Sequence, residues 1–125
     1  MKPLTSEWIR KAEGDFATAE REYLAESPNY DAVAFHSQQC AEKYLKARLV
    51  EVDIPFPKTH DLSVILDLIL AVEPTWSELR SSLNALTSLG IEVRYPGMFA
   101  DKEDADEALK VARNVRRIVR VVLGQ

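Results

Sequence analysis

Four polar side chains recur at helical spacing around residue 40. They are His36, Gln39, Lys43 and Lys46, at intervals of three, four and three residues. On a helix this spacing puts them on one face, with Gln38 and Glu42 beside them. Amide, carboxylate and ammonium groups in such a cluster can hold the base, ribose and phosphate of a nucleotide. The competing interpretation is a solvated helix face with ordinary neighbour pairs.

Two short motifs outside this segment carry further candidates. In Thr59-His60-Asp61, the histidine can act as a general base or bind phosphate beside a positive helix terminus. Alternatively, Thr59 and Asp61 cap a helix and His60 packs on a neighbour. In Arg94-Tyr95-Pro96, arginine suits bidentate phosphate binding and tyrosine suits stacking or hydroxyl chemistry. The alternative for Arg94 is a structural role at the carbonyls of a helix end.

The last predicted helix carries a basic face. Its arginines are Arg113, Arg116, Arg117 and Arg120. They follow helical spacing opposite a predicted apolar seam of Val111, Val115, Ile118 and Val122. This face could contact RNA or DNA phosphates, or an acidic partner. The competing interpretation is helix stabilisation, because the acids of residues 101–107 precede the bases as the helix dipole favours.

Other kinds of site find no support in the sequence. The four glycines are scattered and form no phosphate-binding loop. Two distant histidines and a single cysteine make no metal set, so we expect neither a metal nor a cofactor. Cys40 lies among apolar neighbours in mid-helix, which indicates a core residue and not a nucleophile.

The elements that must position these residues are all helical. Apolar periodicity and helix breakers predict helices over residues 5–25, 30–52, 60–70, 75–89 and 101–123. The predicted N-caps are Ser6 and Thr59, the predicted C-cap is Gly90, and Asp101 with Asp104 resembles a capping box. We therefore expect a single all-α domain over residues 1–125. Its predicted architecture is an antiparallel up-and-down bundle of four long helices and one shorter helix.

Composition limits the classes of partner. The net charge is −4, which excludes coating of nucleic acid by bulk charge and leaves only local basic patches. A lone cysteine suits a reducing compartment. The first residues lack an apolar signal region, and no apolar run is long enough for a membrane span. We expect a soluble, cytoplasmic protein.

The chemistry-bearing motifs together resemble those of the HEPN family, the "higher eukaryotes and prokaryotes nucleotide-binding" domains. The resemblance rests on Phe35–Ala47, Lys58–Leu62 and Arg94–Pro96, and on the pattern of Trp8, Ala12, Asp15, Phe16 and Ala19. These motifs occur in the family's order and span nearly the whole chain. Each is weak alone, but the set is fairly specific.

The resemblance implies a helical bundle that usually forms a homodimer. Many prokaryotic members are encoded beside a minimal nucleotidyltransferase as a toxin–antitoxin-like pair. Active members are metal-independent ribonucleases marked by an arginine followed, after four to six residues, by a histidine. No arginine of this chain has a histidine at that distance. The resemblance therefore favours a protein without the family's standard ribonuclease site.

Three functional hypotheses follow. The first is a dimeric nucleotide- or RNA-binding and interaction module that works with a nucleotidyltransferase, its nucleotide-binding residues being Gln39, Lys43, Lys46, His60 and Arg94. The second is a metal-independent ribonuclease with a non-standard site of Arg94 with His60 or Tyr95. The third is a purely structural adaptor, in which the shared polar positions form a buried network.

Overall fold

The computed structural model describes residues 1–125 and contains helices and turns without a strand. The elements are α1 (Pro3–Tyr23), α2 (Tyr30–Glu51), α3 (Leu62–Ile69), the 3-10 helix η1 (Pro74–Leu79), α4 (Arg80–Glu92) and α5 (Lys102–Val122). The predicted all-α class is confirmed. None of the helices has a stretch long and apolar enough to cross a lipid bilayer.

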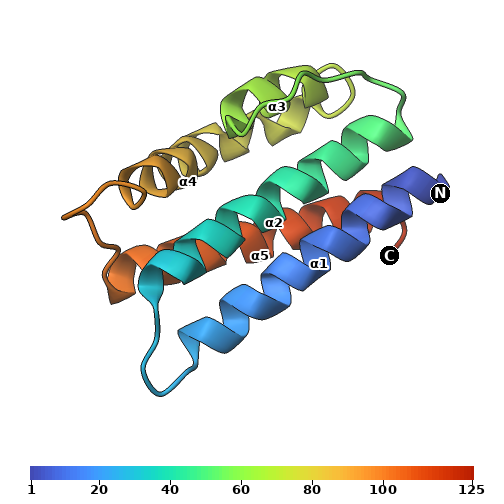
Figure 1. Ribbon diagram of the computed structural model, residues 1–125. Coiled ribbons are helices and arrows are strands. Elements are labelled where there is room, and N and C mark those ends of the chain that lie inside the picture. Colours follow the sequence, from blue (N-terminus) through green and yellow to red (C-terminus); the bar gives the residue numbers. More distant parts are fainter.

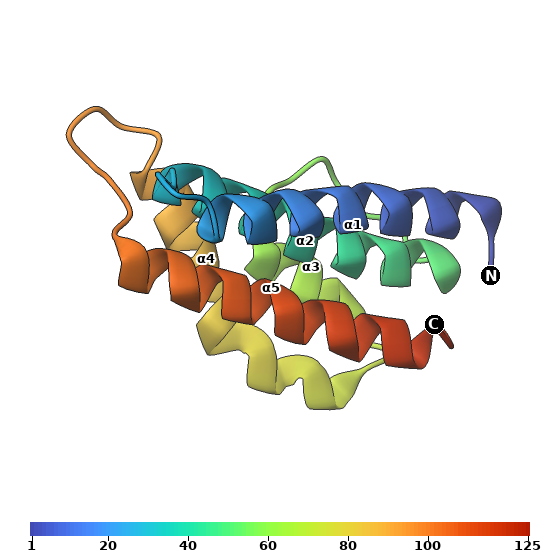
Figure 2. The ribbon, with the colours of Figure 1, turned by 90° about the horizontal axis from the view of Figure 1, so that it is seen from below.

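The helices form a bundle around α2. α1 and α2 make an antiparallel hairpin, and α5 packs behind both of them (Figure 1). On the other side of α2, the short α3 packs with η1 and α4 to complete the bundle. Both chain termini lie at one end, and the loop between α4 and α5 projects from the opposite end (Figure 2). The end of α4 thus carries Arg94 to the edge of the bundle.

Small residues dominate the interface of α1, α2 and α5. The buried alanines on these helices are Ala12, Ala19, Ala34, Ala41, Ala47, Ala105, Ala108 and Ala112. Short side chains at a helix contact allow the two axes to approach closely. Larger fully buried side chains, such as Tyr44, Leu45 and Leu83, fill the remaining core. Each buried leucine contributes roughly 1.5–3 kcal/mol to folding.

The start of α1 differs from the prediction. α1 begins at Pro3, and Ser6 lies inside it instead of capping it. Proline suits the first helical position because its φ is preset and it has no N–H that needs a partner. The backbone N–H of Lys2 and the hydroxyl of Thr5 donate to Glu51 Oε1, at 2.9 and 2.8 Å. The last turn of α2 therefore anchors this end of α1, which local sequence signals did not reveal.

Two other predicted caps are wrong. Asp61, not Thr59, caps α3, because its Oδ1 accepts a hydrogen bond from Ser63 N at 2.9 Å. The Thr59 hydroxyl instead accepts from Asp61 N at 3.1 Å, before the helix begins. Gly90 does not end α4, which continues to Glu92. The Thr59 carbonyl accepts from Lys46 of α2, a tertiary contact that local sequence signals did not reveal.

The capping box of α5 is confirmed. Asp101 Oδ1 accepts from Asp104 N at 2.7 Å, and Asp104 Oδ2 accepts from Asp101 N at 3.1 Å. The predicted seam of α5 is only partly right, since Val115 is buried whereas Val122 is exposed. The buried face consists of Ala105, Ala108, Leu109, Ala112, Val115 and Val119. Half of these buried residues are alanines, which a search for large apolar residues overlooks. Phe35 of α2, the first residue of the Phe35–Ala47 motif, is exposed although it is a large apolar residue.

Candidate functional site

A small polar pocket opens where α2, the start of α3 and the end of α4 meet. Its volume is about 180 Å³. The lining residues are Gln38, His60, Asp61, Thr87, Gly90, Ile91 and Arg94, of which only Ile91 is hydrophobic. Two predicted site residues, His60 and Arg94, thus come together from segments far apart in the sequence.

Three polar residues of α2, one turn apart, hold the Thr59–His60 segment in place. Gln38 Nε2 donates to the His60 carbonyl at 2.9 Å. Glu42 Oε1 lies 2.9 Å from His60 Nδ1. Lys46 Nζ donates to Glu42 Oε2 at 3.0 Å and to the Thr59 carbonyl at 3.1 Å. Because these partners sit on successive turns of one rigid helix, the position of His60 is fixed by α2.

The ion pair at the centre of this arrangement is buried. The side chains of Glu42 and Lys46 are only 4% and 7% exposed. The Lys46 ammonium lies 5.6 Å from the ring centroid of Trp8 and 5.5 Å from that of Phe56. These contacts surround the cation with a carboxylate, a carbonyl and two aromatic faces, which offset the cost of removing it from water.

The imidazole of His60 is held at one edge and free at the other. Its Nδ1 faces the Glu42 carboxylate, and its side chain is 67% exposed. A carboxylate at Nδ1 favours the tautomer with the proton on that nitrogen, which leaves Nε2 as an acceptor. His60, which lines the pocket, therefore keeps a ring nitrogen that has no partner within the chain.

Arg94 is the cation of the pocket. It is exposed, and its guanidinium makes no hydrogen bond or ion pair within the chain. This excludes the predicted alternative in which its side chain binds helix carbonyls. A free guanidinium presents five donors in a planar fork that fits phosphate. Its neighbour Tyr95 is 63% exposed and does not line the pocket.

Two residues of the pocket lining, Gly90 and Gln38, lie against each other, and the amide oxygen of Gln38 is unsatisfied. Gln38 is buried, and its Oε1 has no hydrogen-bond partner. Gly90 faces it: a Cβ added there would lie 3.7 Å from Gln38 Cγ and 3.9 Å from Oε1. A buried carbonyl oxygen without a partner is costly, roughly 1–3 kcal/mol. Polar atoms left in this condition are uncommon in folded proteins and call for an explanation.

The four residues predicted to share a polar face of α2, His36, Gln39, Lys43 and Lys46, do not line this pocket. His36 Nδ1 and Lys43 Nζ both contact Asp15 of α1, at 2.8 and 2.6 Å. Lys43 also borders a separate, open hollow beside Trp8. Gln39 is half-buried and does not line the polar pocket. Lys46 contacts the pocket only indirectly, because it binds Glu42, which in turn contacts His60.

Sequence reasoning placed Gln38 and Glu42 only beside the stripe, and read Asp61 as part of a cap. The structure puts Gln38 and Asp61 in the pocket lining, and Glu42 directly against His60. A signal was present: Gln38, Glu42 and Lys46 are four residues apart, which places them on their own helix face. Choosing between two adjacent polar faces required knowledge of which one meets the His60 segment.

Most of the basic face of α5 binds α1. Arg116 makes a bidentate contact with Glu13, with Nε and Nη2 donating at 2.7 and 2.8 Å. Arg120 reaches the same carboxylate at 3.3 Å, and Arg113 lies 3.4 Å from Glu20. The predicted nucleic-acid patch therefore consists largely of arginines already engaged with carboxylates.

Arg117 is the exception within this basic face. It contacts no carboxylate, and its guanidinium donates to Asn114 at 2.8 Å. Its exposure leaves it available to solvent. Unlike Arg94, Arg117 lines no pocket in which other polar groups could help to hold a phosphate.

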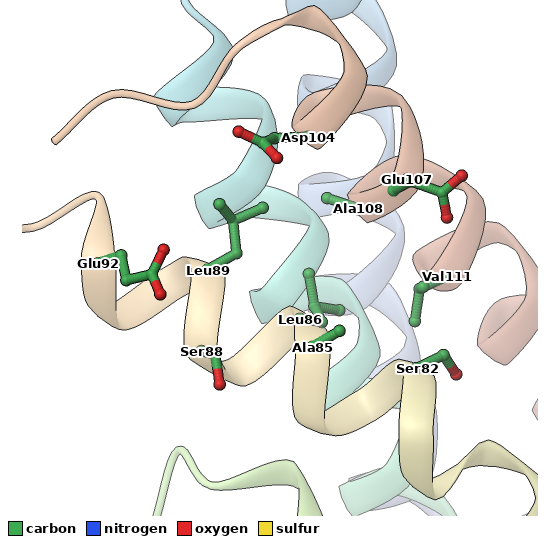
Figure 3. A pocket seen from close by; sticks show the side chains of 10 residues that line it. All are labelled: Ser82, Ala85, Leu86, Ser88, Leu89, Glu92, Asp104, Glu107, Ala108 and Val111. Carbon is green, nitrogen blue, oxygen red and sulfur yellow. The ribbon is translucent and has the colours of Figure 1, made fainter.

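A second hollow, of about 360 Å³, lies between α4 and α5 (Figure 3). Side chains such as Leu86, Leu89 and Val111 form apolar walls. The carboxylates of Glu92 and Glu107 stand at its edges, on α4 and α5 respectively (Figure 3). Because these charges repel phosphate, this hollow does not suit a nucleotide.

Other reactive groups are not arranged for chemistry. The structure holds no cluster of three or more histidine, cysteine, aspartate or glutamate residues that could bind a metal ion. Cys40 is buried, and this burial raises the pKa of its thiol well above the usual range. A thiol in this state is a poor nucleophile.

Comparison with known proteins identifies the family of the chain. The HEPN domain family model matches residues 5–122, nearly the whole chain. The chain belongs to the HEPN family. One curated relative of this HEPN domain is named putative toxin MJ1304, from Methanocaldococcus jannaschii. The two are 30% identical over 134 aligned positions, covering 94% of this chain and 87% of the relative. No solved structure matches the chain.

Proposed function

We propose that this HEPN domain is a nucleotide- or RNA-binding module. The observation that carries the proposal is the meeting of Arg94 and His60 in one polar pocket above the unsatisfied amide of Gln38. The Arg94 guanidinium has no partner within the chain, so it can bind a phosphate through two N–H donors without breaking an existing ion pair. The net charge of −4 confines such binding to a local site of this kind.

The wider biological setting belongs to the same proposal. A relative named as a toxin supports a toxin-like role for this chain. The expected arrangement is a homodimer that works with a nucleotidyltransferase as a toxin–antitoxin-like pair. Size-exclusion chromatography with light scattering tests the dimer. Co-purification with a nucleotidyltransferase encoded beside the chain tests the partner.

Two substitutions at the pocket should weaken binding of a labelled single-stranded RNA, measured by fluorescence anisotropy at low salt. Arg94→Ala removes the phosphate donors, and we expect about a tenfold or greater loss of affinity.

Gly90→Ala places a methyl group in the pocket lining without a clash. It should weaken binding several-fold while stabilising α4 by about 0.5–1 kcal/mol.

Gly14 of α1 provides the matched control. A Cβ at Gly14 meets nothing within 4 Å, and the residue lies mid-helix away from the pocket. Gly14→Ala should therefore raise helix stability by a similar amount and leave RNA affinity unchanged. If Gly90→Ala and Arg94→Ala both bind RNA as the unsubstituted protein does, the pocket is not the binding site.

A second candidate function is metal-independent RNA cleavage. The contact between Glu42 and His60 Nδ1 favours it, because it leaves Nε2 of His60 as a base beside Arg94. In this reaction Nε2 takes the proton of a ribose 2′-hydroxyl, and the 2′ oxygen attacks the adjacent phosphorus. The bond to the 5′ oxygen breaks, and that oxygen receives the proton back. The products are a 2′,3′-cyclic phosphate and a 5′-hydroxyl.

This cleavage should proceed in EDTA and yield cyclic-phosphate ends. We expect His60→Ala to slow it about 100-fold or more, the usual contribution of a general base. His36→Ala is the control, since His36 contacts Asp15 outside the pocket. Equal rates for the two histidine variants, or no cleavage of several RNA sequences, would exclude the reaction and leave binding as the function of the pocket.

A further inference from the structure

Asp61 gives the pocket an anionic group whose role phosphate binding does not explain. It lines the same pocket as Arg94 and His60. No lysine, arginine or histidine lies within ion-pair distance of its carboxylate. Such a carboxylate beside the phosphate-binding cation opposes an incoming phosphate. A phosphate site without a further purpose for this acid would bind more tightly with a neutral residue.

The two oxygens of the Asp61 carboxylate differ in their engagement. Oδ1 accepts from Ser63 N at 2.9 Å and so caps α3, whereas Oδ2 has no partner within the chain. The carboxylate is exposed at the pocket. One oxygen therefore fixes the orientation of the group, and the other remains a strong acceptor for a hydroxyl or amino donor of a ligand.

A second observation marks the same pocket as a ligand site. Gln38 is 5% exposed, and its Oε1 is unsatisfied next to Gly90 in the pocket lining. The pocket therefore offers a cation at Arg94 and an open acceptor at Asp61, and its lining includes Gln38, whose buried oxygen is unsatisfied. A ligand that matches it combines an anionic group with hydroxyl or amino donors close by. A ribonucleotide unit, with its phosphate next to a ribose hydroxyl, has this combination.

We propose that Asp61 is a specificity-determining residue that accepts a hydrogen bond from the ribose 2′-hydroxyl, so that the pocket selects RNA over DNA. This inference rests on the proposed function, because Arg94 must hold the neighbouring phosphate. The 2′-hydroxyl is the group by which a protein distinguishes the two polymers at a given site. Carboxylates accept the same hydrogen bond from a ribose 2′-hydroxyl in dinucleotide-binding folds.

Asp61→Asn tests this role without removing the cap. Asparagine caps helices about as well as aspartate, so its Oδ1 continues to accept from Ser63 N. The free Oδ2 becomes an amide nitrogen, which cannot accept a hydroxyl proton. The probes are a labelled single-stranded RNA and the 2′-deoxy oligonucleotide of identical base sequence, compared by fluorescence anisotropy. Asp67→Asn is the control, because Asp67 is an exposed acid of α3 that pairs with Arg80 outside the pocket.

The unsubstituted protein should bind the RNA several-fold more tightly than the DNA. Asp61→Asn should weaken RNA binding about tenfold and leave DNA binding unchanged or slightly stronger, so that the preference disappears. Asp67→Asn should preserve the preference. Thermal unfolding of both variants should match that of the unsubstituted protein closely.

Two results would overturn this inference alone. If the unsubstituted protein binds RNA and DNA equally, the pocket does not read the sugar. If Asp61→Asn strengthens the binding of both polymers by the same factor, the carboxylate acts only through its charge. Absence of any binding by either polymer would remove the proposed function as well as the inference, and so is a distinguishable outcome.

Discussion

Glu42→Met should destabilise the domain by roughly 3–5 kcal/mol, the largest single effect that we expect outside the apolar core. The substitution leaves the Lys46 ammonium, which is 7% exposed, without its carboxylate. A buried charge that loses its partner keeps its desolvation cost and loses the attraction that offset it. Lys46→Met should be destabilising by a similar amount, because it strands the Glu42 carboxylate. Urea unfolding at neutral pH measures both effects.

The double variant Glu42→Met/Lys46→Met separates pairing from packing. Removing both charges also removes both desolvation costs, so we expect a stability within about 2 kcal/mol of the starting protein. The exposed pair of Asp106 and Lys110, 3.0 Å apart at the same helical spacing, is the control. Lys110→Met breaks that pair while Asp106 keeps its hydrogen bond from the Tyr23 hydroxyl, and it should cost far less stability than breaking the buried pair. Additive losses in the double variant would show that the buried pair is not coupled.

The same double variant separates stability from function. Without Glu42, His60 loses the carboxylate at Nδ1 that orients its ring. A folded double variant should therefore retain much of its binding through Arg94. It should lose any cleavage activity that depends on His60.

Glu13→Gln should destabilise the domain by roughly 1.5–3 kcal/mol at neutral pH, the loss expected for charge-assisted hydrogen bonds. The Glu13 carboxylate accepts from Arg116 at 2.7 and 2.8 Å, from Arg120 at 3.3 Å and from the Tyr44 hydroxyl at 2.6 Å. It thereby joins α1 to both α5 and α2. The amide of glutamine can accept only at one atom and carries no charge.

The stability lost in Glu13→Gln should become smaller as the pH falls. The hydrogen bonds from Arg116 lower the pKa of Glu13, against the opposing effect of its burial. A carboxyl whose pKa is lower in the folded state stabilises the fold fully above its unfolded pKa, about 4.3 for glutamate. That stabilisation is lost as the pH falls through the folded pKa. The difference between Glu13→Gln and the unsubstituted protein should therefore shrink in acid.

Unfolding free energies measured in urea from pH 7 to pH 3 test this. Glu20→Gln is the matched control, because Glu20 lies 3.4 Å from Arg113 in a largely exposed pair. It should change stability by less than about 1 kcal/mol. A Glu13→Gln deficit that stays constant down to pH 3 would assign the effect to packing instead of charge.

Local signals predicted the helices and failed at particular ends. Asn29 and Asp101 provide side-chain caps at the starts of α2 and α5, and both starts were predicted to within one residue. Gly90 shows why other ends were missed. It has the residue type of a C-cap, but it lies inside α4, and Val93 occupies the C-cap position. A glycine inside a helix and a glycine that ends one look identical in sequence.

The candidate site was predictable as a set of motifs and not as a geometry. His60 and Arg94 were identified from their residue types and share one pocket. Lys43 was placed with them because it follows the same helical stripe, yet its ammonium contacts Asp15 on α1. Adjacent residues on a helix differ by about 100° in direction. Gln39 and Lys43, each about 100° around the helix from Gln38 and Glu42, therefore face a different neighbour.

The sequence by itself determined the all-α class, the order of the helices and the HEPN family, because periodicity, caps and motif order are short-range properties of the chain. Only the tertiary structure decided which polar groups pair. The contact between Glu42 and His60 spans 18 residues, and the contact between Glu13 and Arg116 spans 103. Residue types allow many such pairs, and the packing of helices selects among them. That packing left Arg94 and Asp61 open at a pocket and joined the α5 arginines to α1.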